Sequence, residues 1–251
     1  MAILFNSMFS RICLYLMLLL LPAYYTPTGS TPPSLPEAPI SDCRQLYADM
    51  QLENRINYIA FEHALAGSKT IERRNKDIIT LIDFTRPSTE ERLYVLDIRH
   101  KKLLFSSIVS HGKNSGGNYA TSFSNEVGSY KSSLGFFVTE NTYQGKNGYS
   151  LILNGLEKGI NDRAKERAIV MHGANYCSLS VAASAGRLGR SFGCPALPRS
   201  LTQPIIDTIK NGTLLYIYAN DKNYLAHSTI LSTDRSISPN SIIALNNRIL
   251  E

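Results

Sequence analysis

The chain has 251 residues, of which 43% are hydrophobic and 18% charged, so it can form a sizeable core and is not a disordered protein. Its formal net charge of +6 favours polyanionic surroundings such as nucleic acid, a membrane surface or a cell wall, without distinguishing among them. No run of Lys and Arg exceeds two residues, which argues against a nucleic-acid-binding arm. The four cysteines are too few for a disulfide scaffold, and the absence of a C-x-x-C pair argues against a zinc ribbon.

The N-terminal segment is typical of a secretory leader. Residues 1–25 contain one charged side chain, Arg11, followed by ten uncharged residues, 12–21, and then by Pro22 and Ala23. A run of ten is too short for a bilayer, which needs about 20, and matches the apolar region of a signal peptide. We therefore expect 1–25 to be a signal peptide that exports the protein to the periplasm or cell envelope and can anchor it transiently at the membrane. A buried N-terminal helix is the alternative.

The next segment changes from proline-rich to helical. Five of the fifteen residues in 26–40 are proline, which excludes a helix or a central strand and predicts an extended linker. Asp42 then begins a capping-box pattern, and apolar residues follow it at helical spacing. We expect one helix over about 43–66, ended by Gly67, within an N-terminal helical segment, 41–75.

From residue 76 onward the pattern is that of a mainly β protein with a few helices. Short runs rich in Ile, Val, Leu and Tyr alternate with turn-like segments, as in strands joined by short loops. Residues 110–131 form a long Gly, Ser and Asn segment, and a loop of this length is usually functional or mobile. Strands are predicted at 77–84, 92–98, 103–109, 134–139, 149–153, 168–172 and 213–219, and a helix at 204–210.

Cys194 is the candidate nucleophile. It lies between Gly193 and Pro195, in a turn that can present a side chain beside its own N–H group. A thiol needs a neighbouring base to become a nucleophilic thiolate, and His172, at the end of an apolar strand, is the candidate. This spacing alone is weak evidence, because a single histidine at the end of a strand is more often structural.

The segments around these residues resemble the signature of L,D-transpeptidase (YkuD-type) catalytic domains. In that family a His-Gly pair, here His172-Gly173, precedes a [Ser/Thr]-His-Gly-Cys segment, here Ser-Phe-Gly-Cys at 191–194. The likeness covers about 76–220 and is closest to the murein L,D-transpeptidase catalytic domain subgroup. Further matching elements are the strand at 92–98, His111-Gly112, and the segments 115–120, 132–137, 155–159 and 189–198.

The resemblance implies a fold and an organisation. We expect a mainly β, β-sandwich-type catalytic domain with short helices over 76–220, preceded by the N-terminal helix. A C-terminal extension, 221–251, would follow it.

The resemblance also implies an activity. The protein would be an exported cysteine acyltransferase acting on peptidoglycan stem peptides, with no metal or cofactor and no nucleic-acid partner. The thiolate, held by His172 as an ion pair, would attack the carbonyl of the third stem residue and release the terminal D-amino acid. N–H groups around Gly193 and Cys194 would form the oxyanion hole. Transfer to an amine is L,D-transpeptidation. The alternatives are transfer to water by an L,D-carboxypeptidase, a non-catalytic cell-wall-binding module, and a metal-dependent peptidase.

The predicted site contains a catalytic group and a substrate-binding group. The catalytic residues are Cys194, His172, Gly193 and Ser191. Arginines of the substrate group would dock stem-peptide carboxylates, with a solvated surface as the alternative. The predicted substrate-binding residues are Arg190, Arg187, His111, Asn118, Tyr119 and Tyr143.

The sequence departs from the family pattern at Phe192, which replaces the usual second histidine. A phenyl ring cannot transfer a proton, so we expect Phe192 to pack the turn and shield the Cys–His pair from water. Cys177 is expected to be buried and inert, or bonded to Cys43. A zinc site built from these histidines and cysteines has no supporting spacing.

Overall fold

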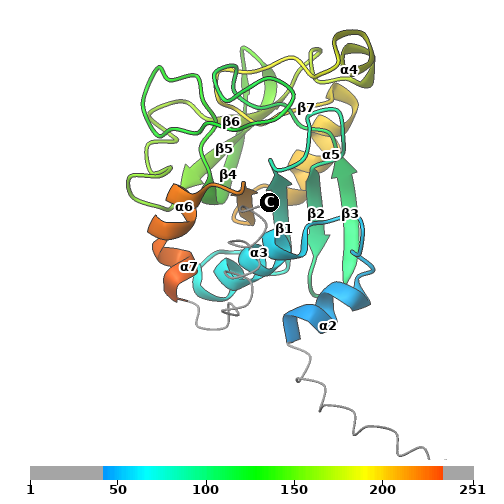
Figure 1. Ribbon diagram of the computed structural model, residues 1–251, viewed down its shortest axis with the longest axis vertical. Helices are drawn as coiled ribbons and strands as arrows, with labels where there is room; N and C mark the ends of the chain where they lie inside the picture. The colour runs from blue at the N-terminus through cyan, green and yellow to red at the C-terminus, as the bar shows by residue number, and fades with distance from the viewer. Residues whose placement is uncertain (1–41, 234–251) are drawn as a thin grey trace, which may run out of the picture. The chain divides into compact units, whose positions relative to one another are not determined.

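The computed structural model describes residues 42–233, so the leader, the proline-rich linker and most of the C-terminal extension lie outside the described residues. A single eight-stranded sheet, in the order β3-β2-β1-β8-β4-β5-β6-β7, is its central element (Figure 1). The β1–β8 and β6–β7 pairs are parallel, and the other pairs are antiparallel. The strands are β1 (Ile78–Asp83), β2 (Leu93–Asp97), β3 (Lys102–Ser107), β4 (Gly135–Gly145), β5 (Gly148–Gly155), β6 (Val170–Gly173), β7 (Ala196–Leu197) and β8 (Leu214–Tyr218). The expected mainly β class is confirmed.

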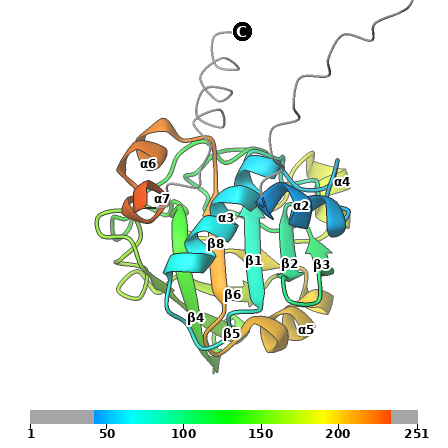
Figure 2. The same ribbon diagram turned by 90° about the horizontal axis from the view of Figure 1, so that it is seen from below.

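The central strands are covered on both faces. All residues of β1 and β8 are buried, which is why these strands read as continuous apolar runs instead of alternating ones. Helix α3 (Tyr58–Thr70) lies across β1 and β8, and helix α5 (Arg199–Ile209) packs on the opposite face (Figure 2). In β4, Phe136 meets α3 at Gly67, whereas the Thr139 hydroxyl bonds to the carbonyl of Ile209 at the end of α5. Residues three apart on a strand point to opposite faces, which agrees with this arrangement.

The N-terminal helical segment differs from the prediction. The single helix expected over 43–66 is wrong, because α2 (Asp42–Asp49) ends and α3 starts only at Tyr58. Gln51 and Asn54 have left-handed backbone conformations, with φ of 54° and 63°, and these turn the chain between the two helices. Asn57 then caps α3 by accepting from the N–H groups of Ile59 and Ala60.

Gly67 does not end α3 as expected, because the helix continues to Thr70. A Cβ at this position would lie 2.2 Å from the Phe136 ring, so the glycine allows close packing of helix on sheet. Helix α5 also differs from the prediction, since it begins at Arg199 rather than at residue 204.

Three short helices complete the described chain: α4 (Leu179–Ala185), α6 (Lys222–His227) and α7 (Thr229–Thr233). The sequence signals after residue 220 are weak and allow no firm prediction there. In the structure Tyr224 and Ser228 both donate hydrogen bonds to the buried carboxylate of Glu157. No helix within residues 42–233 is long and apolar enough to cross a membrane.

The long loop at 110–131 contains no helix or multi-residue strand, as predicted. Two isolated bridges tie its start to the nucleophile region, Ser110 to Ala196 and Gly112 to Ser191. The loop is therefore part of the candidate site.

Candidate active site

Parallel pairing between β6 and β7 sets the frame of the site. His172 lies opposite Ala196 in this pair, and Cys194 comes two residues before Ala196, in the turn that leads into β7. The Val170 N–H lies 3.5 Å from the Cys194 Sγ, so the thiol lies beside the start of β6. Val170 and His172 are two residues apart on one strand, so their side chains share a face. The fold thus places His172 on β6 and Cys194 in the turn that leads into the neighbouring strand β7.

A short turn, defined here as the nucleophile turn, covers residues 191–194. The buried Ser191 hydroxyl donates to the carbonyl of Cys194 at 2.6 Å and accepts from the N–H of Gly193 at 3.0 Å. Gly193 has a φ of 126°, and a Cβ there would lie 2.8 Å from the carbonyl oxygen of Lys131. Glycine is therefore required at this position both by conformation and by the space available.

The Cys194 sulfur lies between a backbone donor and a backbone acceptor. The thiol donates to the carbonyl of Ala168 at 3.6 Å, and the Val170 N–H points at the same sulfur. Ala168 has a φ of 51°, a left-handed conformation that is uncommon for alanine. Burial raises the pKa of the Cys194 thiol, while the Val170 N–H and the positive charge of Arg167 act in the opposite direction.

His172 is buried, with 4% of its surface exposed, and its Nδ1 lies 3.1 Å from the carbonyl oxygen of Gly173. A carbonyl can only accept, so Nδ1 carries the proton and Nε2 keeps its lone pair. Burial lowers the pKa of His172, the Gly173 carbonyl raises it, and the charge of Arg199 lowers it further. The imidazole is thus a neutral base near pH 7.

These directions differ from the expected thiolate–imidazolium ion pair. A raised thiol pKa and a lowered imidazole pKa both favour the neutral forms. Within the described residues, Cys194 and His172 are not hydrogen bonded to each other. The free protein therefore holds a neutral histidine on β6 and a thiol in the turn that leads into β7.

The expected oxyanion hole is only partly available. The N–H of Gly193 is already engaged by the Ser191 hydroxyl. The N–H of Cys194 lies close enough to its own sulfur to lower the thiol pKa. Of the two expected donors, the Cys194 N–H is the one that the hydrogen bonds of the nucleophile turn do not use.

Of the two predicted arginines, Arg190 ties the nucleophile turn to the 110–131 loop, whereas Arg187 bonds within its own segment. Arg190 donates to the carbonyls of Lys113 and Gly116 at 3.1 and 2.8 Å, and Arg187 donates to the carbonyl of Leu188. Both arginines remain partly exposed, so each has solvent-facing surface near the nucleophile turn.

The predicted His111 is structural in its surroundings. It is 1% exposed, its Nδ1 lies 2.8 Å from a guanidinium nitrogen of Arg92, and its ring packs edge-on against Phe84. Burial and the charge of Arg92 lower the pKa of His111 to about 4. A neutral, enclosed imidazole of this kind holds the 110–131 loop in place and does not line an exposed surface.

The other predicted substrate residues lie in three different settings. Asn118 accepts from the N–H and the hydroxyl of Ser88, which pins the loop. Tyr119, on the same loop, is 51% exposed. Tyr143 is 42% exposed on the β4–β5 hairpin, where its ring covers Gly145. Within the described residues, no hydrogen bond or ring contact joins Tyr119 or Tyr143 to the nucleophile turn.

Phe192 does not shield the Cys–His pair as expected. It is 66% exposed, and its ring centroid lies 4.9 Å from that of Tyr130, which is 41% exposed. The ammonium group of Lys113 lies 4.2 and 4.7 Å from the centroids of these two rings. We call these three residues the aromatic–lysine cluster. Sequence reasoning missed Lys113 and Tyr130, since only the folded loop brings them to Phe192.

Arg167 is a second residue that the sequence did not reveal. It precedes the apolar run that leads to His172, where a charged side chain usually marks solvent. In the structure its guanidinium is half-buried and would lie 3.3 Å from a Cβ at Gly193. It is the cation whose charge acts on the Cys194 thiol.

The remaining described cysteines are free thiols, so Cys43 and Cys177 do not form the alternative disulfide. Cys177 is fully buried with Ile108 and Leu188 in a small second core, as expected for an inert thiol. Burial raises the pKa of each of these two thiols to about 11. No group of three His, Cys, Asp or Glu side chains suited to a metal occurs between residues 42 and 233.

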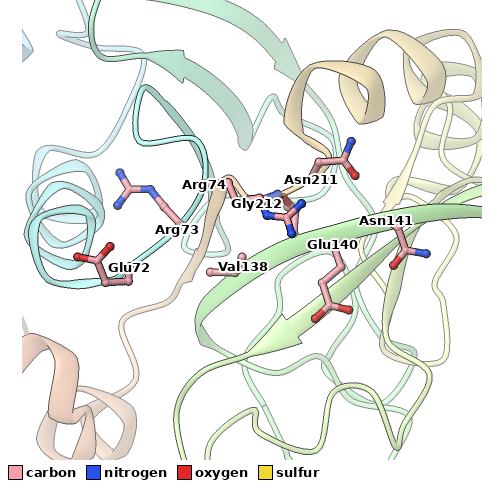
Figure 3. Close-up of a pocket in the computed structure, with 9 residues that line it drawn as sticks. Glu72, Arg73, Arg74, Val138, Glu140, Asn141, Asn211 and Gly212 are labelled. Carbon is pink, nitrogen blue, oxygen red and sulfur yellow. The ribbon is translucent and has the colours of Figure 1, made fainter.

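Two described cavities lie away from the nucleophile turn. One, of about 450 Å³, lies between the segment after α3 and the middle of β4, with Arg74, Glu140 and Gly212 at its wall (Figure 3). The other, of about 750 Å³, lies at the start of α3. None of the residues that line either cavity belongs to the predicted site.

Comparison with known proteins identifies the family of this chain. The family model of the L,D-transpeptidase catalytic domain matches residues 52–218, two thirds of the chain. This chain therefore belongs to the L,D-transpeptidase catalytic domain family, whose enzymes act on peptidoglycan. A comparison with curated proteins found no match.

Several solved structures are similar at low sequence identity. An L,D-transpeptidase from Mycobacterium smegmatis is 12% identical, with 57% of this chain and 59% of that chain covered and a TM-score of 0.36. A variant of the helical cell shape determining protein Pgp2 from Campylobacter jejuni is 15% identical over 74% and 62% of the two chains, with a TM-score of 0.40. An L,D-transpeptidase from Stackebrandtia nassauensis is 14% identical over 72% and 79%, with a TM-score of 0.35. The chain thus spans about three fifths of the length of the first of these relatives.

Proposed function

We propose that the protein is a cysteine L,D-transpeptidase in which Cys194 is the nucleophile and His172 the base. The parallel β6–β7 register carries the proposal, because it brings the thiol beside Val170 and His172 to the next position on the same strand face. Both residues lie inside the segment that matches the family model. A binding module would need neither a thiol nor a neutral imidazole at this place.

The reaction begins from the neutral pair. As the Cys194 sulfur attacks the carbonyl carbon of the third stem residue, its proton passes to Nε2 of His172, which the Gly173 contact leaves free. The tetrahedral intermediate carries its negative charge on the former carbonyl oxygen, toward which the Cys194 N–H turns. Collapse breaks the amide bond, and the imidazolium returns the proton to the leaving D-amino acid.

The second half-reaction regenerates the thiol. An amine of a second stem peptide attacks the thioester, and His172 takes its proton. The thiolate then leaves and recovers that proton as the cross-link forms. Water in place of the amine gives L,D-carboxypeptidase activity by the same steps, so the acceptor determines the reaction outcome.

Substrate binding is assigned to the exposed groups around the nucleophile turn. The aromatic–lysine cluster offers two exposed aromatic side chains and an ammonium group, and one of the rings, Phe192, belongs to the nucleophile turn. Together with Arg190 these groups supply positive charge for stem-peptide carboxylates. His111 and Asn118 act indirectly, by holding the loop that carries Lys113.

Export is also part of the proposal, because the substrate lies outside the cytoplasm. The support for export is the order of features in residues 1–25, where a charged residue is followed by an apolar run and then by proline. These residues lie outside the described part of the chain. A reporter fused after residue 40 should be active only beyond the cytoplasmic membrane. Cytoplasmic retention of a full-length fusion would contradict export.

The activity is tested by product analysis of the purified protein with a tetrapeptide muropeptide. Transpeptidation predicts a cross-linked dimer with loss of one terminal D-amino acid per bond. A tripeptide product alone would show the carboxypeptidase. Binding without any product, by a protein with a reduced Cys194, would support the non-catalytic module and contradict the proposal.

A further inference from the structure

We propose that Arg167 is the positioning residue that sets the ionisation of the Cys194 thiol. It would act as a fixed positive charge behind the nucleophile turn and would not touch the substrate. The inference deepens the proposed function and rests on Cys194 as its nucleophile. It also assigns a role to a residue outside the sequence motif.

The position of Arg167 is fixed by four hydrogen bonds. One terminal nitrogen donates to the carbonyl of Ser124 and the hydroxyl of Ser133, at 2.6 and 2.5 Å. The other donates to the carbonyl of Lys131 at 2.6 Å and the hydroxyl of Ser129 at 3.3 Å. These partners all come from the serine-rich segment 124–133, so the guanidinium cannot swing away without breaking several bonds.

The same guanidinium lies directly behind the nucleophile turn. Its Nη2 would be 3.3 Å from a Cβ at Gly193, the residue before Cys194. On the other side, the carbonyl of Ala168, which follows Arg167 in the chain, contacts the Cys194 sulfur. Arg167 is therefore linked to the thiol in two ways: its guanidinium packs against Gly193, which precedes Cys194, and its neighbour Ala168 accepts from the Cys194 sulfur.

Among the described residues, no carboxylate forms an ion pair with Arg167. All four hydrogen-bond partners are neutral oxygens, and within residues 42–233 Arg167 forms no salt bridge. A half-buried cation without a counterion favours an anion nearby, because burial weakens the screening by water. The thiolate of Cys194 would be that anion.

Arg167 therefore opposes the main obstacle to this nucleophile. Burial disfavours the thiolate, and the backbone N–H groups of Val170 and Cys194 are the uncharged donors that stabilise it. The guanidinium compensates for the neutral state of His172, which supplies no positive charge before attack. In effect the cation lowers the free energy of the thiolate as it forms, without ionising it in advance.

The test measures the ionisation of the thiol without a peptidoglycan substrate. The rate of alkylation by iodoacetamide is followed from pH 6 to 11 and quantified by mass spectrometry on the peptide that contains Cys194. The first variant is R167Q, which keeps a hydrogen-bond donor but loses the charge. The second is R167K, which keeps the charge but loses the two terminal nitrogens of the guanidinium. R163M removes an exposed cation from the same turn, paired with Glu166, and is the matched control.

We expect R167Q to raise the pKa of the Cys194 thiol by about one unit or more, which is the scale of a nearby opposite charge. At neutral pH this corresponds to about tenfold slower alkylation. R167K and R163M should stay within half a unit of the parent protein. A folded R167Q with an unshifted pKa would overturn the proposal, as would a shift in R167K as large as that in R167Q.

Two further outcomes are distinguishable. If circular dichroism shows that R167Q does not unfold cooperatively, the test rests on R167K. Because R167K keeps the charge, a rise of one unit in the pKa of its Cys194 thiol would contradict the proposed role of Arg167. A shifted thiol pKa in a protein that forms no acyl-enzyme would contradict the proposed function alone. An acyl-enzyme with an unshifted pKa in R167Q would contradict the role of Arg167 alone.

Discussion

The hydroxyl of Ser191 donates a 2.6 Å hydrogen bond to the carbonyl of Cys194 and so closes the turn that presents the thiol. The same oxygen accepts from the N–H of Gly193, so one buried side chain satisfies both ends of the turn. Ser191 thus positions the nucleophile without contacting its sulfur. Its predicted catalytic role becomes a positioning role.

Removing this hydroxyl should impair the site more than the fold. Ser191→Ala leaves the Gly193 N–H and the Cys194 carbonyl without their partner, which costs about 1–3 kcal/mol of stability. We expect acylation by a carbapenem to fall at least tenfold, because the thiol loses its fixed orientation. Ser191→Thr, which keeps the hydroxyl, should retain most of the rate. Ser184→Ala, on the exposed side of α4, is the control, and an Ser191→Ala rate equal to that control would contradict the role.

The pH dependence of acylation should follow His172. Because its pKa lies below the usual 6.5, the imidazole is neutral and basic at pH 7 and becomes protonated only in more acidic solution. Stopped-flow acylation should therefore rise with pH through a midpoint below 6.5 and stay level toward pH 8.

Replacement of His172 by Ala should abolish this rise of the acylation rate with pH and lower the rate about a hundredfold or more. A variant with near-parent rates would mean that the base lies elsewhere. His111→Gln serves as a comparison, since it alters a second buried imidazole that the mechanism does not use.

Phe192 should matter for binding and little for stability. Its ring is 66% exposed, so Phe192→Ala should change the free energy of unfolding by less than about 0.5 kcal/mol. Loss of an exposed ring at the nucleophile turn should raise the half-saturating concentration of a stem peptide severalfold and leave the maximal acylation rate nearly unchanged. Leu179→Ala, at a residue that is 70% exposed on α4, is the matched control. Equal half-saturating concentrations in the two variants would remove the aromatic–lysine cluster from the substrate site.

Two buried histidines should make the fold sensitive to acid. Burial lowers the pKa of both His63 and His111 to about 4, against 6.5 for a free side chain. Between these values the unfolded chain binds protons that the folded chain does not, so stability is fully present above pH 6.5 and is lost as pH falls toward 4. Urea titrations at pH 7, 6 and 5 should show a falling free energy of unfolding. A level or rising free energy over this range would contradict the assignment.

The sequence predicted the strands well where packing on both faces produces continuous apolar runs. The predicted strands 77–84 and 213–219 differ from β1 and β8 by one residue at each end. The helix over 43–66 failed because its apolar spacing continues through a turn made by Gln51 and Asn54. Periodicity records which side chains are buried and does not show where the backbone reverses.

For the site, the sequence motif identified Cys194 and His172, and the parallel register explains why they are neighbours. The protonation states could not be predicted, since they depend on burial and on the Gly173 carbonyl. Arg167 was missed for a related reason. Its partners lie 34 to 43 residues away in the chain, and only folding brings that loop to the thiol.

The most direct test of the account is to locate the acyl group. The purified protein is incubated with a carbapenem or a tetrapeptide muropeptide, and the adduct is mapped by peptide mass spectrometry. The account predicts one added acyl mass on Cys194, absent from Cys194→Ser and retained in Cys177→Ser. An adduct on Cys177, or acylation of Cys194→Ser at the parent rate, would contradict it.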